Sequence, residues 1–455
     1  MNSEGGEGLE GERNFGKVGA SRGITVKIEL TQGNWGKVSV EIPDKNLMGI
    51  IEPKEIPSLA DVETKIREVM SNPTYSKRLS EMIKPRNNVV IVVTDITRPC
   101  PDDKLVPIIL EELHDADVPC NKVTILIATG MHRPMTDGEA MEKLSKSVYE
   151  RVEVANHVCT DKEKLVYLGK TPNLRIPLWV NKIVADADVV VSTGMVDTHI
   201  FAGYTGGGKS IMPGVSGLET IENMHRPRWL GNRFVGVCSV DRNPVRLDID
   251  EAARKAGLRF IVNVVLNGYG EIAHIRIGDP IRAHRELCKI VDKIVKAPIS
   301  DLPDIVISFP GYPKDRDLYQ ATRAANNFVC GPTPAIKRGG VIIIPALCQD
   351  GTGSNTFYKW MKNAKDLDEI TERGIREPIL GAHRPFIMAK ILKRADVIIV
   401  GSKIPCIVEE MKMIATETMD EALEMAMKKM GDEAKILISP HGLTTVPIFK
   451  PGMKT

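Results

Sequence analysis

Two histidines, a glycine triplet and a lysine stand close together near the middle of the chain. The glycines occupy positions 206–208 and are followed directly by Lys209, while His199 and His225 lie on either side. Glycine permits a backbone turn with positive φ and lets a ligand approach the chain closely. A lysine beside such a loop supplies a point charge for phosphate or, when desolvated, an amine nucleophile. Because histidine titrates near neutral pH or binds a metal, this stretch predicts a site for a small ligand.

The same stretch matches a nucleotide-binding motif, which gives an alternative interpretation. Residues 203–210 read GYTGGGKS, the pattern of the phosphate-binding loop (P-loop) in nucleotide hydrolases. That loop needs a helix after the lysine, with its N–H groups and dipole facing the phosphates. Pro213 falls in the second turn of such a helix, where proline costs about 3 kcal/mol. A P-loop hydrolase is therefore the less favoured interpretation. A plain glycine turn and a non-catalytic cofactor-binding or carrier protein are two further alternatives.

Polar residues follow several apolar, β-branched segments. Residues 88–94 (NVVIVVT) lead into 95–98 (DITR), and residues 122–128 (KVTILIA) lead into a loop that contains His132. Continuous apolar runs are typical of strands that are buried on both faces. A third run at 187–193 leads toward the glycine loop. The pattern predicts a doubly wound sheet with ligand-binding residues at the carboxyl ends of its strands.

The chain is long enough for two domains, since 455 residues exceed what one core usually supports. Later apolar segments predict a second sheet; they lie at 304–309, 340–345, 395–400 and 435–439. We expect an α/β fold of two Rossmann-like doubly wound domains that face one another across a cleft. Residues 23–295 would begin with a β-hairpin and carry the glycine loop, and residues 296–455 would close over the substrate. Residues 1–22, rich in Gly, Glu and Arg, are predicted to form a disordered tail.

Composition excludes several classes of partner. The net charge is +2, with no tract of like charge, which argues against nucleic acid. No apolar run reaches the roughly 18 residues that span a membrane. Eight scattered cysteines without a C-x-x-C pair predict reduced thiols and a cytoplasmic protein. Oligomer formation is left open.

Four motifs occur in the order found in one known family. They are DITRP at 95–99, GMHRP at 130–134, the His-x9-Lys-x15-His spacing of 199, 209 and 225, and LYQA at 318–321. From about residue 85 to 440 the chain resembles the LarA-type, nickel-pincer-dependent 2-hydroxyacid racemases, of which lactate racemase is the founding member. The resemblance implies an isomerase that racemises or epimerises a 2-hydroxy acid by reversible hydride transfer.

The resemblance also implies a cofactor and a role for each matching residue. The family's cofactor is nickel held by a pyridinium-3,5-bisthiocarboxylic acid mononucleotide, and Lys209 matches the lysine that binds one arm covalently. His225 matches the nickel ligand, and His132 and His199 match the acid/base pair on opposite faces of the substrate. The other implied cofactor contacts are Asp95, Ile96, Thr97, Arg98, Gly206, Gly207 and Gly208, and the implied substrate contacts are Arg98, Tyr319 and Gln320. Cofactor-making enzymes are implied as partners, beside the small hydroxy acid itself.

Hydride transfer explains these residue types. Removing Cα–H as a proton is hard, because that carbon is a very weak acid next to an ionised carboxylate. Removing hydride needs only an acceptor and a base for the hydroxyl proton, and a histidine suits that base. The mirror-image substrate needs a second histidine, and an arginine such as Arg98 can hold the carboxylate.

Two positions depart from the pattern of lactate racemase. Arg323 stands where that enzyme has a lysine, and a forked guanidinium is not equivalent to an ammonium. His383 falls near the position of an active-site tryptophan. Both changes make the substrate side more polar. They predict a substrate more polar than lactate, such as malate, 2-hydroxyglutarate or a sugar acid.

Overall fold

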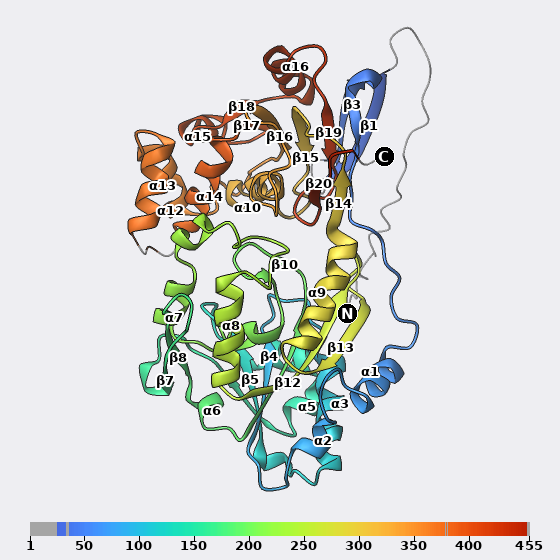
Figure 1. The fold of residues 1–455 in the computed structure, drawn as a ribbon, viewed down its shortest axis with the longest axis vertical. Helices are drawn as coiled ribbons and strands as arrows, with labels where there is room; N and C mark the ends of the chain where they lie inside the picture. The colour runs from blue at the N-terminus through green and yellow to red at the C-terminus, as the bar shows by residue number, and fades with distance from the viewer. Residues whose placement is uncertain (1–24, 33–35, 378, 380, 453–455) are drawn as a thin grey trace, which may run out of the picture.

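The computed structural model describes residues 25–32, 36–377, 379 and 381–452. The predicted tail at 1–22 lies outside this range. Two α/β halves lie one above the other along the long axis of the molecule (Figure 1). Each half contains one six-stranded sheet. The prediction of two doubly wound α/β halves with an N-terminal hairpin is confirmed, while a cleft between them stays a prediction.

The first sheet has the strand order β13-β12-β9-β4-β5-β6. All its neighbouring strands are parallel except β13, which runs antiparallel to β12. Its strands are β4 (Val89–Thr94), β5 (Val123–Ala128), β6 (Glu153–Asn156), β9 (Val189–Met195), β12 (Leu258–Leu266) and β13 (Ile272–Gly278). Alternate residues of β4 enter different cores, with Ile91 in one and Val92 in the other. Burial on both faces explains the continuous apolar sequence of this strand.

The order of the strands reverses beside β4. The chain runs from β4 to β5 and β6 on one side, and β9 and β12 then occupy the other side. In open α/β sheets, ligands bind at such a switch point, outside the carboxyl ends of the strands. The loops after β4 and β9 are therefore the places where this half should hold a ligand.

Helices cover both faces of the first sheet (Figure 1). They are α1 (Val62–Ser71), α2 (Leu79–Met82), α3 (Asp102–Asp115), α4 (Asp137–Leu144), α5 (Lys146–Tyr149), α6 (Lys182–Ala185), α7 (Leu218–Met224), α8 (Pro244–Lys255) and α9 (Arg282–Val295). Two short ribbons complete this half, β7 (Leu165–Lys170) with β8 (Pro177–Asn181) and β10 (Thr198–His199) with β11 (Gly203–Tyr204). Within the described ranges, no helix combines the length and apolar content that a membrane span requires.

The second sheet is parallel throughout and has the order β18-β17-β16-β15-β19-β3. Its strands are β3 (Leu47–Ile50), β15 (Ile305–Ser308), β16 (Gly340–Pro345), β17 (Ala395–Val400), β18 (Ile414–Thr416) and β19 (Ile436–Ser439). Its helices are α10 (Leu318–Ala321), α11 (Asn326–Val329), α12 (Asn355–Asn363), α13 (Leu367–Arg376), α14 (His383–Leu392), α15 (Pro405–Glu410) and α16 (Met419–Met430). A further parallel pair, β14 (Lys296–Ile299) with β20 (Val446–Phe449), follows α9. The order reverses beside β15, so the loop that leads to α10 lies at a second switch point.

The N-terminal segment differs from the prediction, which placed residues 23–295 in one domain. Strand β3 pairs with β19 and thus belongs to the second sheet. The hairpin of β1 (Thr25–Gln32) and β2 (Gly36–Pro43) buries Val40 and Ile42 in the core of that same sheet. The physical reason is that β19 would otherwise present an open edge, which β3 covers. Because this pairing joins residues almost 400 positions apart, as in Ile50 with Ile438, no local pattern reveals it.

Two core substitutions should separate the halves. Ile42 and Ile66 are both fully buried, but Ile42 lies in the core of the second sheet and Ile66 in that of the first. Replacing either with Ala should cost about 2–5 kcal/mol of unfolding free energy. Hydrogen exchange should then accelerate in residues 300–440 for Ile42→Ala and in residues 60–280 for Ile66→Ala. Faster exchange confined to the first sheet in Ile42→Ala would contradict the placement of the hairpin.

Candidate functional site

A carboxylate and a histidine meet where β4 and β5 end. Asp95 follows β4, and its Oδ2 lies 2.5 Å from Nδ1 of His132, which follows β5. The Thr97 hydroxyl donates to the other carboxylate oxygen at 2.6 Å. A carboxylate at Nδ1 places the ring proton there, because only an N–H can bond to it. The free Nε2 of His132 is therefore a proton acceptor.

The environment of Asp95 favours its charged form. The carboxyl is buried, which alone would raise its pKa. The hydrogen bonds from His132 and Thr97, together with the charge of Arg98, outweigh burial and lower the pKa below its usual value. An ionised Asp95 orients the imidazole and stabilises the positive charge that forms when Nε2 takes up a proton.

His199 has the opposite arrangement. Its Nδ1 accepts hydrogen bonds from the backbone N–H groups of Phe201 at 3.2 Å and Ala202 at 3.1 Å. The neutral ring must then carry its proton on Nε2, which makes that atom a donor. Burial, together with the positive charges of Arg246 and Arg98, holds the pKa of His199 well below its usual value. The two predicted acid/base histidines thus differ in the position of the ring proton. Nε2 is an acceptor in His132 and a donor in His199.

Lys209 lies in a short turn of 3-10 helix, Gly207–Ser210, and no α-helix follows it directly. The next α-helix is α7, which begins at Leu218. The phosphate-binding geometry of a P-loop is therefore absent from this stretch. This agrees with the effect expected of Pro213.

The glycine triplet is required by the packing of the protein itself. A Cβ atom would lie 2.8 Å from Oδ1 of Asn263 at Gly206, 2.9 Å from the His284 ring at Gly207, and 2.9 Å from Cβ of Ala253 at Gly208. Gly206 and Gly207 also have φ of +72° and +57°. The sequence interpretation assigned these glycines to close approach of a ligand. The structure gives them a different reason, and contact with a cofactor on the opposite side of the loop stays a prediction.

The surroundings of the Lys209 amine disfavour its charged form. No hydrogen bond or salt bridge joins it to any residue in the described part of the chain. Burial, followed by the charges of Arg246 and Arg98, lowers the pKa of Lys209 well below its usual value. An amine with a depressed pKa keeps its lone pair near neutral pH and can attack an acyl carbon.

His225 fits the requirements of a single metal ligand. Its Nδ1 donates to the carbonyl of Ile221 at 2.8 Å, which leaves the Nε2 lone pair free. Burial lowers the pKa of His225 to about 4, so the ring is neutral at physiological pH. Across the described ranges, no three His, Cys, Asp or Glu side chains gather as a metal-binding group. A metal held by His225 would need its remaining ligands from a bound group.

Residues of the second half reach the same place. The Phe201 ring lies 5.4 Å from that of His225 and 5.8 Å from that of His383, which begins α14. The hydroxyl of Tyr319 lies 3.0 Å from Nε2 of His383, whose Nδ1 is buried without a hydrogen-bond partner among the described residues. Arg323 donates to Oε1 of Gln320 at 2.7 Å. The structure thus brings together predicted residues from four loops and two helices.

Sequence reasoning missed the groups that hold these loops. Arg246 in α8 donates to carbonyls of the glycine loop, and His284 in α9 lies against Gly207. Neither residue belongs to a motif that the sequence singles out. A basic residue within a charged helical segment looks like a solvated side chain, so nothing local distinguished Arg246. The one available signal was the pair Asn243-Pro244, which is typical of a helix start. The first turn of that helix carries Arg246 and lies against the glycine loop.

The neutral histidines predict acid sensitivity of the fold. Burial lowers the pKa of His225 to about 4 and of His383 to about 3, whereas an unfolded chain titrates near 6.5. Protons therefore bind the unfolded chain preferentially, and stability that is present above about pH 6.5 is lost as the pH falls. Urea unfolding from about pH 7 to about pH 5 should show a decreasing free energy. His383→Gln should reduce this slope and the exposed control His114→Gln should not, whereas a flat wild-type profile would refute the burial of neutral rings.

Comparison with known proteins places this geometry in a family. A family model of the lactate racemase N-terminal domain matches residues 34–233, and one of the lactate racemase C-terminal domain matches residues 299–447. The chain is 32% identical over 426 residues to the lactate racemase of Thermoanaerobacterium thermosaccharolyticum, covering 92% of this chain and 98% of that one. It is 31% identical over 417 residues to the lactate racemase of Lactiplantibacillus plantarum, covering 90% and 97%.

Solved structures agree with this assignment. The lactate racemase apoprotein from T. thermosaccharolyticum superposes with a TM-score of 0.83 at 31% identity, over 93% of this chain and all of that one. A Thermotoga maritima protein shares the fold, with a TM-score of 0.63 at 21% identity over 87% of this chain. The prediction of a racemase-type isomerase is confirmed at the level of the family. The chain belongs to the lactate racemase family.

Proposed function

We propose that this protein racemises or epimerises a 2-hydroxy acid, using a nickel-pincer pyridinium mononucleotide attached to Lys209. The observation that carries the proposal is a combination of two groups. The Lys209 amine has a strongly lowered pKa and no ion pair with a described residue, and the His225 ring has only its Nε2 free. Lys209 would hold the group through an acyl link, and His225 would give the metal one nitrogen ligand beside soft sulfur ligands, as suits nickel. When bound, this group supplies the acceptor for the hydride of the substrate.

His132 is the base for one enantiomer. Its Nε2 accepts the hydroxyl proton, and Asp95 stabilises the imidazolium that results. The His132 ring is 46% exposed, whereas the Asp95 side chain is only 4% exposed. The ring is therefore accessible to a substrate while its carboxylate partner is held in the protein interior. Such a residue typically contributes about 10²–10⁴-fold to the rate.

His199 serves the opposite face. In the arrangement described, its Nε2–H donates to a substrate oxygen and holds a carbonyl there. To accept a proton from the hydroxyl of the other enantiomer, the ring must carry its proton on Nδ1 and release the amides of Phe201 and Ala202. The two half-reactions therefore differ in what the protein must rearrange.

Arg98 is suited to the substrate carboxylate. Its main chain is held on both sides, by the Arg98 N–H to Asp95 carbonyl bond at 3.1 Å and by the Lys143 ammonium on the Arg98 carbonyl at 2.7 Å. Its side chain is exposed and makes no salt bridge with a described residue. A fixed backbone with a free guanidinium can receive a carboxylate in bidentate fashion.

The second half favours a polar substrate. With the Tyr319 hydroxyl donating to Nε2 of His383, the buried Nδ1–H is an unsatisfied donor, which costs about 1–3 kcal/mol. A second carboxylate or a sugar hydroxyl would satisfy that donor and could also accept from Arg323. A hydroxy dicarboxylic acid or a sugar acid therefore fits better than lactate, whose methyl group offers no acceptor.

Loading tests the proposed site. Co-expression with cofactor-making enzymes should give about one nickel per chain and an increased intact mass that denaturation does not remove. Lys209→Ala should lose the covalent mass, and His225→Ala should keep the mass but lose most of the nickel. The exposed Lys162→Ala is the control and should retain both. A wild-type protein with unmodified mass and no metal would contradict the proposal, and a loaded protein that racemises no hydroxy acid would indicate a carrier.

Substrate preference tests the polar pocket. Loaded enzyme should racemise malate, 2-hydroxyglutarate or a sugar acid with higher kcat/KM than lactate, as measured by chiral chromatography. Arg323→Met removes a charge-assisted bond and should lower kcat/KM for the preferred substrate by about 10- to 100-fold. Activity on lactate should change much less. Lactate turnover far above that of every polar acid would contradict this assignment.

A further inference from the structure

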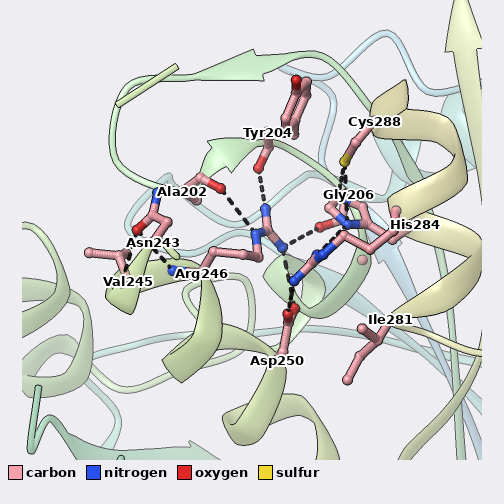
Figure 2. Close-up of polar contacts among 12 residues, drawn as sticks. Ala202, Tyr204, Gly206, Asn243, Val245, Arg246, Asp250, Ile281, His284 and Cys288 are labelled. Atoms are coloured by element: carbon pink, nitrogen blue, oxygen red, sulfur yellow. Dashed lines mark hydrogen bonds and ion pairs between the residues drawn. The ribbon is translucent and has the colours of Figure 1, made fainter. Parts of the chain in front are cut away.

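Arg246 lies fully buried beneath the loop that carries Lys209. Its guanidinium donates from Nε to the Ala202 carbonyl at 3.0 Å, from Nη1 to the Gly206 carbonyl at 3.3 Å, and from Nη2 to the Tyr204 carbonyl. Figure 2 shows these three bonds converging on one side chain from the loop. A planar fork of five donors fixes several acceptors at once, which a lysine cannot do.

The same helix also holds the backbone beside His199. Asn243 caps α8 and donates from Nδ2 to the Phe201 carbonyl at 2.8 Å. The N–H groups of Phe201 and Ala202 in turn bind Nδ1 of His199. The first turn of α8 thus fixes the loop from His199 to Gly206.

The positive charge of Arg246 is only partly compensated. Asp250 lies 3.7 Å from Nη1 of Arg246, but the same carboxylate also binds Arg285 at 2.5 Å. Arg285 further donates to Nδ1 of His284 at 3.0 Å, and Nε2 of His284 bonds to the Thr205 carbonyl at 2.8 Å. Arg285 also pairs with Asp241 at 3.5 Å, but that carboxylate is 85% exposed and compensates little. Asp250 is therefore the one buried carboxylate that the two guanidinium groups share among the described residues, and the positive charge under the loop is compensated incompletely.

We propose that Arg246 is a positioning residue that sets the reactivity of Lys209, by fixing the carbonyls of the loop and by keeping an incompletely compensated positive charge close to the amine. The inference rests on the proposed function only in that Lys209 is the point of attachment. It adds that the amine is activated by the fold before any cofactor arrives. An ordinary protonated lysine would have to lose a proton first.

Every ionisable group that acts on Lys209 favours its neutral form. After burial, the largest contributions that lower its pKa come from Arg246 and Arg98. His199, His225 and His284 also interact with the amine, and burial holds the pKa of each below its usual value, so these rings stay neutral. Asp95 is engaged by His132, and Asp250 by the two arginines. No described carboxylate pairs with the amine to counter this effect.

Acylation of the apoprotein measures the state of this amine directly. With acetic anhydride, the nitrogen lone pair forms a bond to the acyl carbon, the carbon–oxygen bond to acetate breaks, and one proton leaves to solvent. Only the neutral amine reacts, so the pH at half-maximal labelling reports its protonation. Peptide mass spectrometry after short pulses gives this midpoint for Lys209, with exposed Lys162 as the internal reference.

The wild-type midpoint for Lys209 should lie well below that of Lys162. Arg246→Gln should raise the midpoint by about one pH unit or more and slow labelling near pH 7 about tenfold. Asp250→Asn removes the shared counter-charge and should move the midpoint in the opposite direction. Arg246→Lys keeps the charge without the fork and should recover most of the wild-type midpoint. A purely structural role for Arg246 would not produce shifts of opposite sign.

Arg254→Gln is the matched control, because this arginine lies on the same helix but is 64% exposed and pairs with Glu251. It should leave the midpoint unchanged. A folded Arg246→Gln with the wild-type midpoint would overturn the inference. If that variant does not fold, an unchanged midpoint in Asp250→Asn overturns it, and a lowered midpoint supports it.

The result is independent of cofactor loading. A depressed midpoint in apoprotein that never acquires an adduct would remove the proposed function and leave the role of Arg246 intact. An adduct that forms on Lys209 with an ordinary midpoint would support the proposed function and overturn the role of Arg246.

Discussion

Burial of nitrogen bases beside fixed positive charge is the condition on which this site depends. An amine or imidazole taken out of water loses the hydration of its charged form, and adjacent guanidinium groups add to that penalty. Burial is the largest cause of the lowered pKa of Lys209, His199, His225 and His383 alike. The neutral form of each group is consequently favoured. Asp95 brings a negative charge to the site and pairs with His132.

Buried cations that bind backbone carbonyls keep the loops in place. Arg246 holds the glycine loop, and Lys143 does the same for the loop after β4, donating to the carbonyls of Arg98 at 2.7 Å and Cys100 at 2.6 Å. The Lys143 charge is balanced by Asp102 at 3.2 Å, whereas Asp250, the carboxylate that pairs with Arg246, also pairs with Arg285. The difference matters because the positive charge near Lys209 is thereby compensated less completely. A loop fixed by its carbonyls also keeps its side chains free for a ligand.

Local patterns in the sequence predicted the sheets and the loops that carry the site. Apolar runs ending in polar residues located Asp95 and His132, and the strand order then brought these ends to one switch point. What local patterns could not reveal depends on contacts between distant residues. The pairing of β3 with β19, the burial of Arg246, and the opposite proton positions on His132 and His199 all arise from such contacts. The packing that requires the glycine triplet was not evident from local patterns either, since the space beside it is filled by Asn263, His284 and Ala253.

Our central claim is a proposal: His225 contributes one imidazole to a metal that arrives with its own soft ligands. Nickel K-edge X-ray absorption of the loaded protein tests that claim most directly. The account predicts a planar four-coordinate nickel with sulfur scattering and one imidazole nitrogen. A spectrum with two or more imidazoles, or with only oxygen and nitrogen ligands, would contradict it.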